Sequence, residues 1–508
     1  MSDIPAGSRR VLIGLCIAMG GALVGIASLN YVLTPMMSDL GIDPEDADIA
    51  LAIPSIASLF VVFLAGMLGD RRGQRTVIAW MSALFIAGSI IFTLAQGLTL
   101  IVIGLLLQGI GSTAIQILVF GLLSARFSVP KERASAFGTF GMVSPFIWMC
   151  MPVLTGWVVG LVSWRWVGVI WIVSGLAIFV ATQRLLPRPE KVRPIGEVWT
   201  PILAGVTVAA MVGSLDTLHS EGLAWSTFAA FAITAGLALV CAILLRRLPA
   251  PTFSLSPLRT KSTRSFLGVV IIIPLINTVF LMTIAFQYLY GLSVLQTALV
   301  MIPAQACAVL GTRLIAGPMM RRYGVPRTAT IFFLLLIPAM LCAFLVQVDS
   351  PLWVPAAYVA AYNVLTVAAS ITVSSGLLNS DPSVPSDQLS AYRGSGVALG
   401  GVLATVLMNG LVFSLGRLFM NESFQANGLS QADSASLMSQ IQDSATSPDV
   451  MSQYAVPLPS GVETTVVIQE SILTGLHANA ILGAALALVS VFLIRRAART
   501  RAAAHTGA

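Results

Sequence analysis

Charged side chains are scarce in this sequence. Only 10% of its 508 residues are charged and 57% are hydrophobic, and the mean hydropathy is +0.90. Because soluble domains carry about 25% charged residues, this composition excludes a water-soluble enzyme. An apolar run of about 20 residues is long enough to cross a bilayer as a helix. The sequence therefore predicts an all-α integral membrane protein.

Residue patterns typical of metal sites and of disulfide frameworks are absent as well. The five cysteines are scattered through apolar runs without a CxxC pair, and the three histidines lie far apart with no HxxH or HExxH pattern. This spacing excludes a zinc cluster and a disulfide scaffold. No nucleophile, metal cluster or carboxylate pair is visible inside the apolar runs. We therefore predict no enzyme activity, no metal site and no cofactor.

Hydropathy predicts fourteen transmembrane helices. The first follows Arg9 and Arg10 without an A-x-A cleavage site, so we expect a retained helix rather than a signal peptide. The predicted spans are 11–33, 48–68, 76–95, 99–124, 135–160, 165–184, 198–215, 224–245, 266–288, 296–319, 328–347, 352–377, 395–416 and 472–494.

The basic residues set the orientation of these spans. With both termini in the cytoplasm, 25 of the 28 Lys and Arg residues fall on the cytoplasmic side, as the positive-inside rule requires. The net charge of +7 is thus a topology signal and does not indicate nucleic-acid binding. We expect a multi-pass protein of the cytoplasmic (inner) membrane, from a bacterium. The polar stretch 417–471 is predicted to be a flexible external loop with some amphipathic helix.

Two motifs recur in the sequence with nearly the same offset. The segment 66–76 is echoed at 317–328, and the segment 129–137 is echoed at 384–392. Both echoes fall on predicted cytoplasmic loops, so spans 1–6 and 9–14 are predicted to be two six-helix pseudo-repeat bundles in the same orientation. Parallel repeats of this kind are typical of secondary transporters. The predicted units are 1–187 (N-terminal bundle), 188–263 (two inserted helices) and 264–508 (C-terminal bundle with the external loop).

Four motifs resemble the major facilitator superfamily, and within it the fourteen-span drug:proton antiporter group. They are Gly66-x-Leu68-Gly69-Asp70-Arg71-x-Gly73-x-Arg75, Ser163-Trp164-Arg165-Trp166, Gln287-x-x-x-Gly291-x-Ser293 with Pro303 downstream, and Arg393-x-x-Gly396-x-x-x-Gly400. The resemblance implies efflux of drug-like or amphipathic molecules by alternating access. The partners it implies are a small-molecule substrate, the lipid bilayer, protons and a periplasmic adaptor protein.

The sequence departs from that group where proton coupling is expected. The span-4 arginine of the family is replaced by Leu105, and its span-1 acidic residue would fall near Gly25 or Ile26. Proton antiport normally uses a carboxylate inside the membrane, and none lies securely within a span. An organic-anion transporter, or a uniporter with weak proton coupling, is therefore an alternative. A non-transporting membrane sensor is a more remote one.

Residues of the first repeated loop are predicted to form a conformational latch. Asp70 would pair with a helix N-terminus or an arginine and hold the cytoplasmic side in one conformation. The other proposed latch residues are Gly66, Arg71, Gly73, Arg75 and Arg133.

Polar and aromatic residues inside the spans are candidates for a substrate cavity. Gln108, Ser112 and Gln116 recur every four residues and share one helix face, which lines either a cavity or another helix. Arg313 lies about 12 Å deeper than Arg321 at 1.5 Å per residue, so it either binds an anionic group or extends back to the cytoplasmic surface. The remaining candidates are Asn30, Tyr31, Trp148, Asn277, Gln287, Tyr358, Tyr362 and Asn363.

Overall fold

The computed structural model describes residues 5–41, 61–188, 198–221, 224–247, 256–292, 294–381, 383–404, 410–444 and 457–506. These residues are almost entirely helical. The one β-bridge among them pairs Pro457 with Glu463. The all-α prediction is therefore confirmed for this part of the chain.

The N-terminal half contains six labelled helices and the helical residues 61–72. The helices are α1 (Ala6–Leu40), α3 (Gln74–Thr93), α4 (Leu98–Arg126), α5 (Pro130–Phe140), α6 (Val143–Leu161) and α7 (Arg165–Leu185). Two further helices follow, α8 (Trp199–Glu221) and α9 (Trp225–Arg247).

The C-terminal half begins with a short 3₁₀ turn and ends in the longest helix. Its elements are η1 (Ser256–Arg259), α10 (Lys261–Leu275), α11 (Val279–Tyr288), α12 (Val294–Gly311), η2 (Thr312–Ala316), α13 (Gly317–Tyr323), α14 (Val325–Leu341), η3 (Cys342–Leu345), α15 (Trp353–Leu378), α16 (Ser386–Leu403), α17 (Gly410–Ala426), α18 (Gln431–Ser444) and α20 (Thr464–Thr506).

Ten helices in the described residues are long and apolar enough to cross a membrane, and Trp199–Ser214 forms a shorter apolar helix. The predicted count of fourteen is not confirmed, because residues 48–60 and 405–409 of two predicted spans lie outside the described part. A third predicted span, 266–288, is divided into α10 and α11 around Asn277. Pro274 near the end of α10 lacks an N–H, and the Asn277 side chain accepts a hydrogen bond from the Val279 N–H at the start of α11.

The repeated motifs adopt the same local structure in both halves. Gly73 (φ 84°) precedes α3 and Gly324 (φ 76°) precedes α14, and both occupy a positive-φ conformation that favours glycine. The helix pairings also correspond. In the N-terminal half α3 packs against α4 and α7, and in the C-terminal half α14 packs against α15 and α20.

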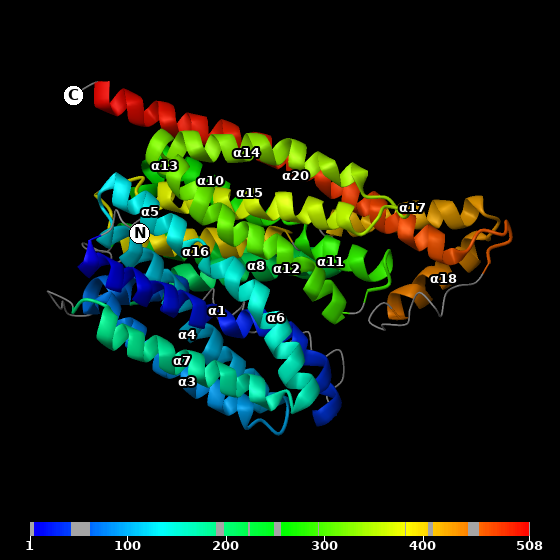
Figure 1. Ribbon diagram of the computed structural model, residues 1–508, viewed down its shortest axis with the longest axis horizontal. Coiled ribbons are helices and arrows are strands. Elements are labelled where there is room, and N and C mark those ends of the chain that lie inside the picture. Colours follow the sequence, from blue (N-terminus) through cyan, green and yellow to red (C-terminus); the bar gives the residue numbers. More distant parts are fainter. Residues whose placement is uncertain are drawn as a thin grey trace.

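The two bundles lie close together near α5 and α13 and diverge toward the other end of the molecule (Figure 1). The described N- and C-terminal segments lie at the α5/α13 end. We call this end the basic end, because it carries Arg126, Lys131, Arg321 and Arg322. The helices α17 and α18 lie at the opposite end (Figure 1), where part of the predicted external loop is helical around a small core that includes Phe424.

Buried apolar side chains of the described residues form five clusters. Two of them contain residues of both halves, namely the largest cluster and a smaller one that includes Ile117 of α4 and Tyr392 of α16. The largest cluster contains Phe120 and Phe137 of the N-terminal half together with Met320 and Phe332 of the C-terminal half. Toward the opposite end, the cluster around Trp171 draws only on the N-terminal half. A further cluster, around residues 281–289 of α11, draws only on the C-terminal half. The apolar packing thus joins the two bundles at the basic end.

Candidate functional site

Helix backbones meet where the two halves touch. A Cβ atom at Gly138 in α5 would lie 2.9 Å from the Cα of Gly317 in α13 and 3.2 Å from the carbonyl oxygen of Thr312. Side-chain atoms do not approach backbone atoms this closely, so the contact depends on glycine at 138. A Cβ atom at Gly317 would instead lie 3.4 Å from the Ala134 carbonyl oxygen, which is an ordinary contact.

Arg313 joins the halves beside this glycine contact. Its Nη1 donates a hydrogen bond to Thr139 Oγ1 at 3.0 Å, from the C-terminal half to α5. Arg313 lies in η2, a π-helical turn that immediately precedes α13. Pro318 accounts for this turn, because its ring would clash with the carbonyl of residue 314 in a regular α-helix. Arg313 is half-buried, while its neighbours Leu314 and Ile315 are exposed on the outer surface.

A second set of contacts joins α4 to the C-terminal half. The guanidinium carbon of Arg393 lies 3.6 Å from the ring centroid of Phe120, and its Nε donates to Ser374 Oγ at 2.8 Å. Ser390 Oγ donates to the carbonyl of Ile117 at 2.6 Å. In the sequence, Arg393 begins one of the four family-like motifs, and its contact with a ring of the other half could not be predicted from spacing.

The polar face of α4 packs against α1. Ser112 Oγ donates to the Ala22 carbonyl at 2.7 Å, and Gln116 Nε2 donates to Ser112 Oγ at 3.2 Å. Gln108 is 1% exposed, and its Nε2 has no acceptor among the described residues. A Cβ atom at Gly25 would lie only 1.7 Å from this nitrogen. The Gln108 amide therefore occupies the space that a side chain at position 25 would take.

The predicted polar residues of α15 bond to neighbouring helices within their own half. Tyr362 OH donates to the Ile276 carbonyl at 3.2 Å, and Tyr358 OH lies 3.4 Å from Thr278 Oγ1. Asn363 Nδ2 donates to Gln305 Oε1 at 3.0 Å. All three predicted residues are buried, so these bonds stabilise the packing of the C-terminal half. A role of the same residues in a substrate cavity stays a prediction.

The other cavity candidates are spread over several helices. Trp148 in α6 and Asn277 between α10 and α11 are exposed, and Asn277 accepts a bond from α11. Tyr31 and Gln287 are half-buried. The side chain of Asn30 lies outside the described part of the structure. The four described residues do not form one cluster with α4 through the contacts described above.

The predicted latch residues are divided among several contacts. Arg75 Nη2 donates to the carbonyl and to Oε1 of Gln183, at 2.6 and 3.0 Å, and ties the start of α3 to the end of α7. Arg133 donates to the carbonyls of residues 127 and 128 in its own turn. Asp70 is exposed beside half-buried Arg71, and Gly66 is buried. The Arg75 and Arg133 contacts lie within the N-terminal half, so the latch role stays a prediction.

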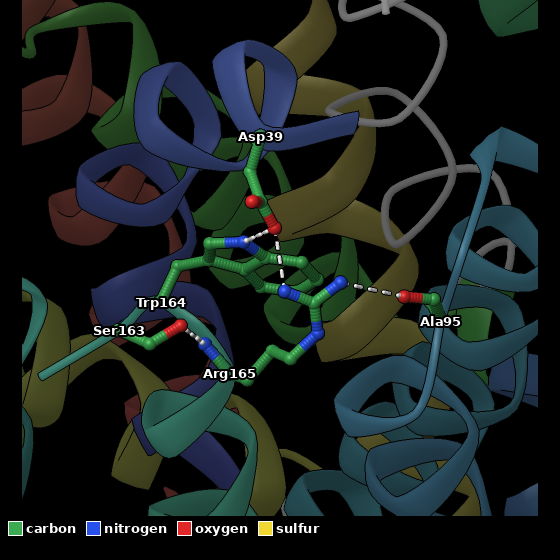
Figure 2. Close-up of polar contacts among 5 residues, drawn as sticks. All are labelled: Asp39, Ala95, Ser163, Trp164 and Arg165. Carbon is green, nitrogen blue, oxygen red and sulfur yellow. Dashed lines mark hydrogen bonds and ion pairs between the residues drawn. The ribbon is translucent and has the colours of Figure 1, made fainter. Parts of the chain in front are cut away.

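A charged cluster fastens the N-terminal half at the end opposite the basic end (Figure 2). One carboxylate oxygen of Asp39 accepts hydrogen bonds from Trp164 Nε1 at 2.9 Å and from Arg165 Nη1 at 2.5 Å. Arg165 also donates to the Ala95 carbonyl at 3.3 Å. The bonds from Trp164 and Arg165 lower the pKa of Asp39 below its usual range. The cluster thus ties α1 and the α3–α4 loop to α7.

This cluster changes the interpretation of the tryptophan motif. Tryptophans at the ends of membrane spans commonly form an aromatic belt that faces the lipid headgroups. Trp166 is 54% exposed, as a belt requires, but Trp164 is 3% exposed and its ring stacks edge-on with Phe92. Trp164 is therefore packed inside the N-terminal half rather than in such a belt. The pairing with Asp39 could not be predicted, because the two residues are 125 positions apart.

The sequence of this chain is similar to that of a known family of membrane transporters. The sequence profile of the Major Facilitator Superfamily matches residues 13–201, and relatives that carry the superfamily's name match beyond this range. Residues 13–201 are therefore similar to the Major Facilitator Superfamily, and the longer matches to relatives extend this similarity along the chain. Members of this superfamily are membrane transporters rather than enzymes.

Superfamily relatives align with parts of the chain. The uncharacterized MFS-type transporter YhcA of Bacillus subtilis (strain 168) is 25% identical over 335 residues, which are 63% of this chain and 61% of YhcA. The uncharacterized MFS-type transporter Rv1877 of Mycobacterium tuberculosis (strain H37Rv) is 28% identical over 184 residues, 36% of this chain and 26% of Rv1877. The putative multidrug resistance protein MdtD of Escherichia coli O9:H4 (strain HS) is 26% identical over 339 residues, 64% of this chain and 70% of MdtD.

Among solved structures of the superfamily, the human organic anion transporter MFSD10 (TETRAN) is similar in fold. Its TM-score is 0.63 with 13% sequence identity, and the match covers 97% of this chain and 100% of that one. At this identity the likeness concerns the fold alone.

Proposed function

We propose that this transporter exports small amphipathic organic molecules across the cytoplasmic membrane by alternating access, with the basic end in the cytoplasm. The observation that carries the proposal is the arrangement of the buried clusters. Two clusters contain residues of both halves, whereas the clusters around Trp171 and around residues 281–289 each draw on one half. Such an arrangement is expected of a transporter whose halves are closed on one side. The positive-inside rule supports the orientation.

The Gly138–Gly317 contact and the Arg313–Thr139 bond support a reversible closure. Both connect α5 to the segment around η2 and α13, and a separation of these elements would break them together. Contacts that form and break together suit alternation, since each state needs only a small free-energy advantage over the other.

The polar face of α4 supports an organic substrate. Gln108 offers a buried amide whose Nε2 has no acceptor among the described residues, and Gln116, about two helical turns further along the same face, is half-buried. Such a neutral hydrogen-bonding face in apolar surroundings suits drug-like molecules. The similarity to the putative multidrug resistance protein MdtD points to the same class of substrate. Because Leu105 replaces the family's arginine, we infer weak or indirect proton dependence.

The test is uptake of cationic, neutral and anionic amphipathic dyes by the purified protein in proteoliposomes, with and without a proton gradient. We expect Gln108→Leu and Gln116→Leu to slow uptake of the preferred dye, while Gln347→Leu, at an exposed position outside the helices, leaves it unchanged. Equal uptake by all variants would remove the α4 face from the substrate path. Steep proton dependence abolished by one substitution would contradict the inferred coupling.

A further inference from the structure

An apolar groove runs along the outer side of the N-terminal half, between α1, α6 and α7. Its volume is about 580 Å³, and Val309 of α12 contributes to its wall from the other half. Ile13, Ile17 and Phe146, which line it, are 42%, 37% and 50% exposed. These exposed apolar side chains open the groove to the surroundings of the protein, which in a membrane are lipid.

The groove is distinct from the polar face of α4. Its α1 wall includes Gly20 and Val24, whereas Gly25 and the Ala22 carbonyl on the same helix face Gln108 and Ser112. From Leu12 to Val24 the wall extends about 18 Å at 1.5 Å per residue. This length is close to one leaflet of a hydrocarbon core about 30 Å thick. The dimensions match a single acyl chain.

The positively charged side chain of Arg313 lies at the basic end of the groove. Thr139, one of the lining residues, accepts the hydrogen bond from Arg313. A guanidinium has five N–H donors, and this is the one hydrogen bond that Arg313 makes within the described residues. No carboxylate of the described part pairs with it. Arg313 can therefore donate several further bonds to an acidic oxygen.

We propose that an anionic phospholipid of the cytoplasmic leaflet occupies this groove, with its phosphate on Arg313 and one acyl chain along α1 and α6. Phosphate oxygens suit a guanidinium because they accept paired hydrogen bonds. The headgroup then lies toward the basic end and the chain toward the middle of the bilayer, as the cytoplasmic leaflet requires. Since Val309 and Arg313 belong to the C-terminal half, the bound lipid would stabilise the closed basic end. The proposal does not depend on which molecule is transported.

The test is binding of dioleoyl phosphatidylglycerol, with dioleoyl phosphatidylcholine for comparison, to the purified protein in detergent, followed by thermal unfolding. We expect phosphatidylglycerol to raise the unfolding temperature more than phosphatidylcholine does. Arg313→Gln should raise the apparent Kd for phosphatidylglycerol by about tenfold or more, because a hydrogen bond to a charged group is lost. Arg313→Lys should show a smaller loss, and Arg322→Gln, an exposed arginine nearby, should show none.

Two further variants separate the groove from general effects. Thr139→Val removes the bond that holds the Arg313 guanidinium but keeps the charge, so it should weaken the affinity for the lipid less than Arg313→Gln does. Ala177→Trp places a large side chain in the groove and should weaken binding, whereas Val173→Trp, at an exposed position of the same helix, should not. If Arg313→Gln does not fold, the affinities of Arg313→Lys and Ala177→Trp for phosphatidylglycerol test the proposal instead.

Several results would overturn the proposal. One is equal binding by wild-type, Arg313→Gln and Arg313→Lys proteins. A second is equal affinity for dihexanoyl phosphatidylglycerol, since its short chains cannot fill the groove. A third is undiminished binding by Ala177→Trp. Transport of a tail-labelled phosphatidylglycerol between leaflets by the wild type would identify the lipid as a substrate and would contradict its assignment as a resident ligand.

Discussion

Gly138→Ala should open the closed basic end. The added methyl would lie 2.9 Å from Gly317 Cα and 3.2 Å from the Thr312 carbonyl oxygen, and these backbone atoms cannot move without separating α5 from α13. Overpacking of this kind costs about 1–3 kcal/mol. At about 1.4 kcal/mol per decade, the ratio of closed to open molecules should fall roughly 5- to 150-fold. Because the cost falls on one conformation, the protein should still fold.

The assay is electron spin resonance distance measurement between labels on Lys131→Cys in α5 and Arg322→Cys in α13, after replacement of the five native cysteines. We expect Gly138→Ala to add a population with a longer distance. Gly317→Ala is the matched control, since its methyl would lie 3.4 Å from the Ala134 carbonyl oxygen and should be tolerated. Identical distance distributions for wild type and Gly138→Ala would refute the reasoning.

Three other perturbations test separate parts of the structure. The pKa of Asp39 is lowered in the folded protein, so the stabilisation from this carboxylate should be complete above its unfolded pKa of about 3.9 and be lost as the pH falls through the lower folded value. In thermal unfolding measured against pH, Asp39→Asn should abolish this acid dependence. An unchanged dependence of the unfolding temperature on pH would exclude the cluster as its source. Asp70→Asn should leave expression normal but slow transport, and normal transport would remove Asp70 from the latch. Reporters fused after residues 320 and 440 should be cytoplasmic and external respectively, and a cytoplasmic signal from the second would contradict the fourteen-span topology.

Local backbone features could be predicted from the sequence because they depend on nearby residues. The echo of Gly73 in Gly324 indicated two equivalent loops, and both glycines have the positive φ that such a turn requires. The division of the predicted span 266–288 was missed, although Pro274 and Asn277 together carried a signal for it. A proline removes a helix hydrogen bond, and an asparagine can cap the helix that follows.

Contacts between distant helices could not be predicted. Arg313 stood out as a cation within a span, but nothing in the sequence indicated that Thr139, 174 residues away, would accept its bond. In the same way, the hydrogen bonds that Asp39 accepts from Trp164 and Arg165 depend on how α1 packs against α7. The stripe of Gln108, Ser112 and Gln116 was read as facing either a cavity or a helix. Ser112 bonds to α1, which supports the second choice at that residue.

Dye accumulation in everted membrane vesicles tests the central claim most directly, because it reports transport that depends on closure at the basic end. At matched expression, vesicles with the wild-type protein should accumulate an amphipathic dye faster than vesicles without it. Gly317→Ala should behave like the wild type, and Gly138→Ala should be slower, in proportion to its loss of the closed state. Accumulation no faster with the wild-type protein than without it, across cationic, neutral and anionic dyes, would contradict the account.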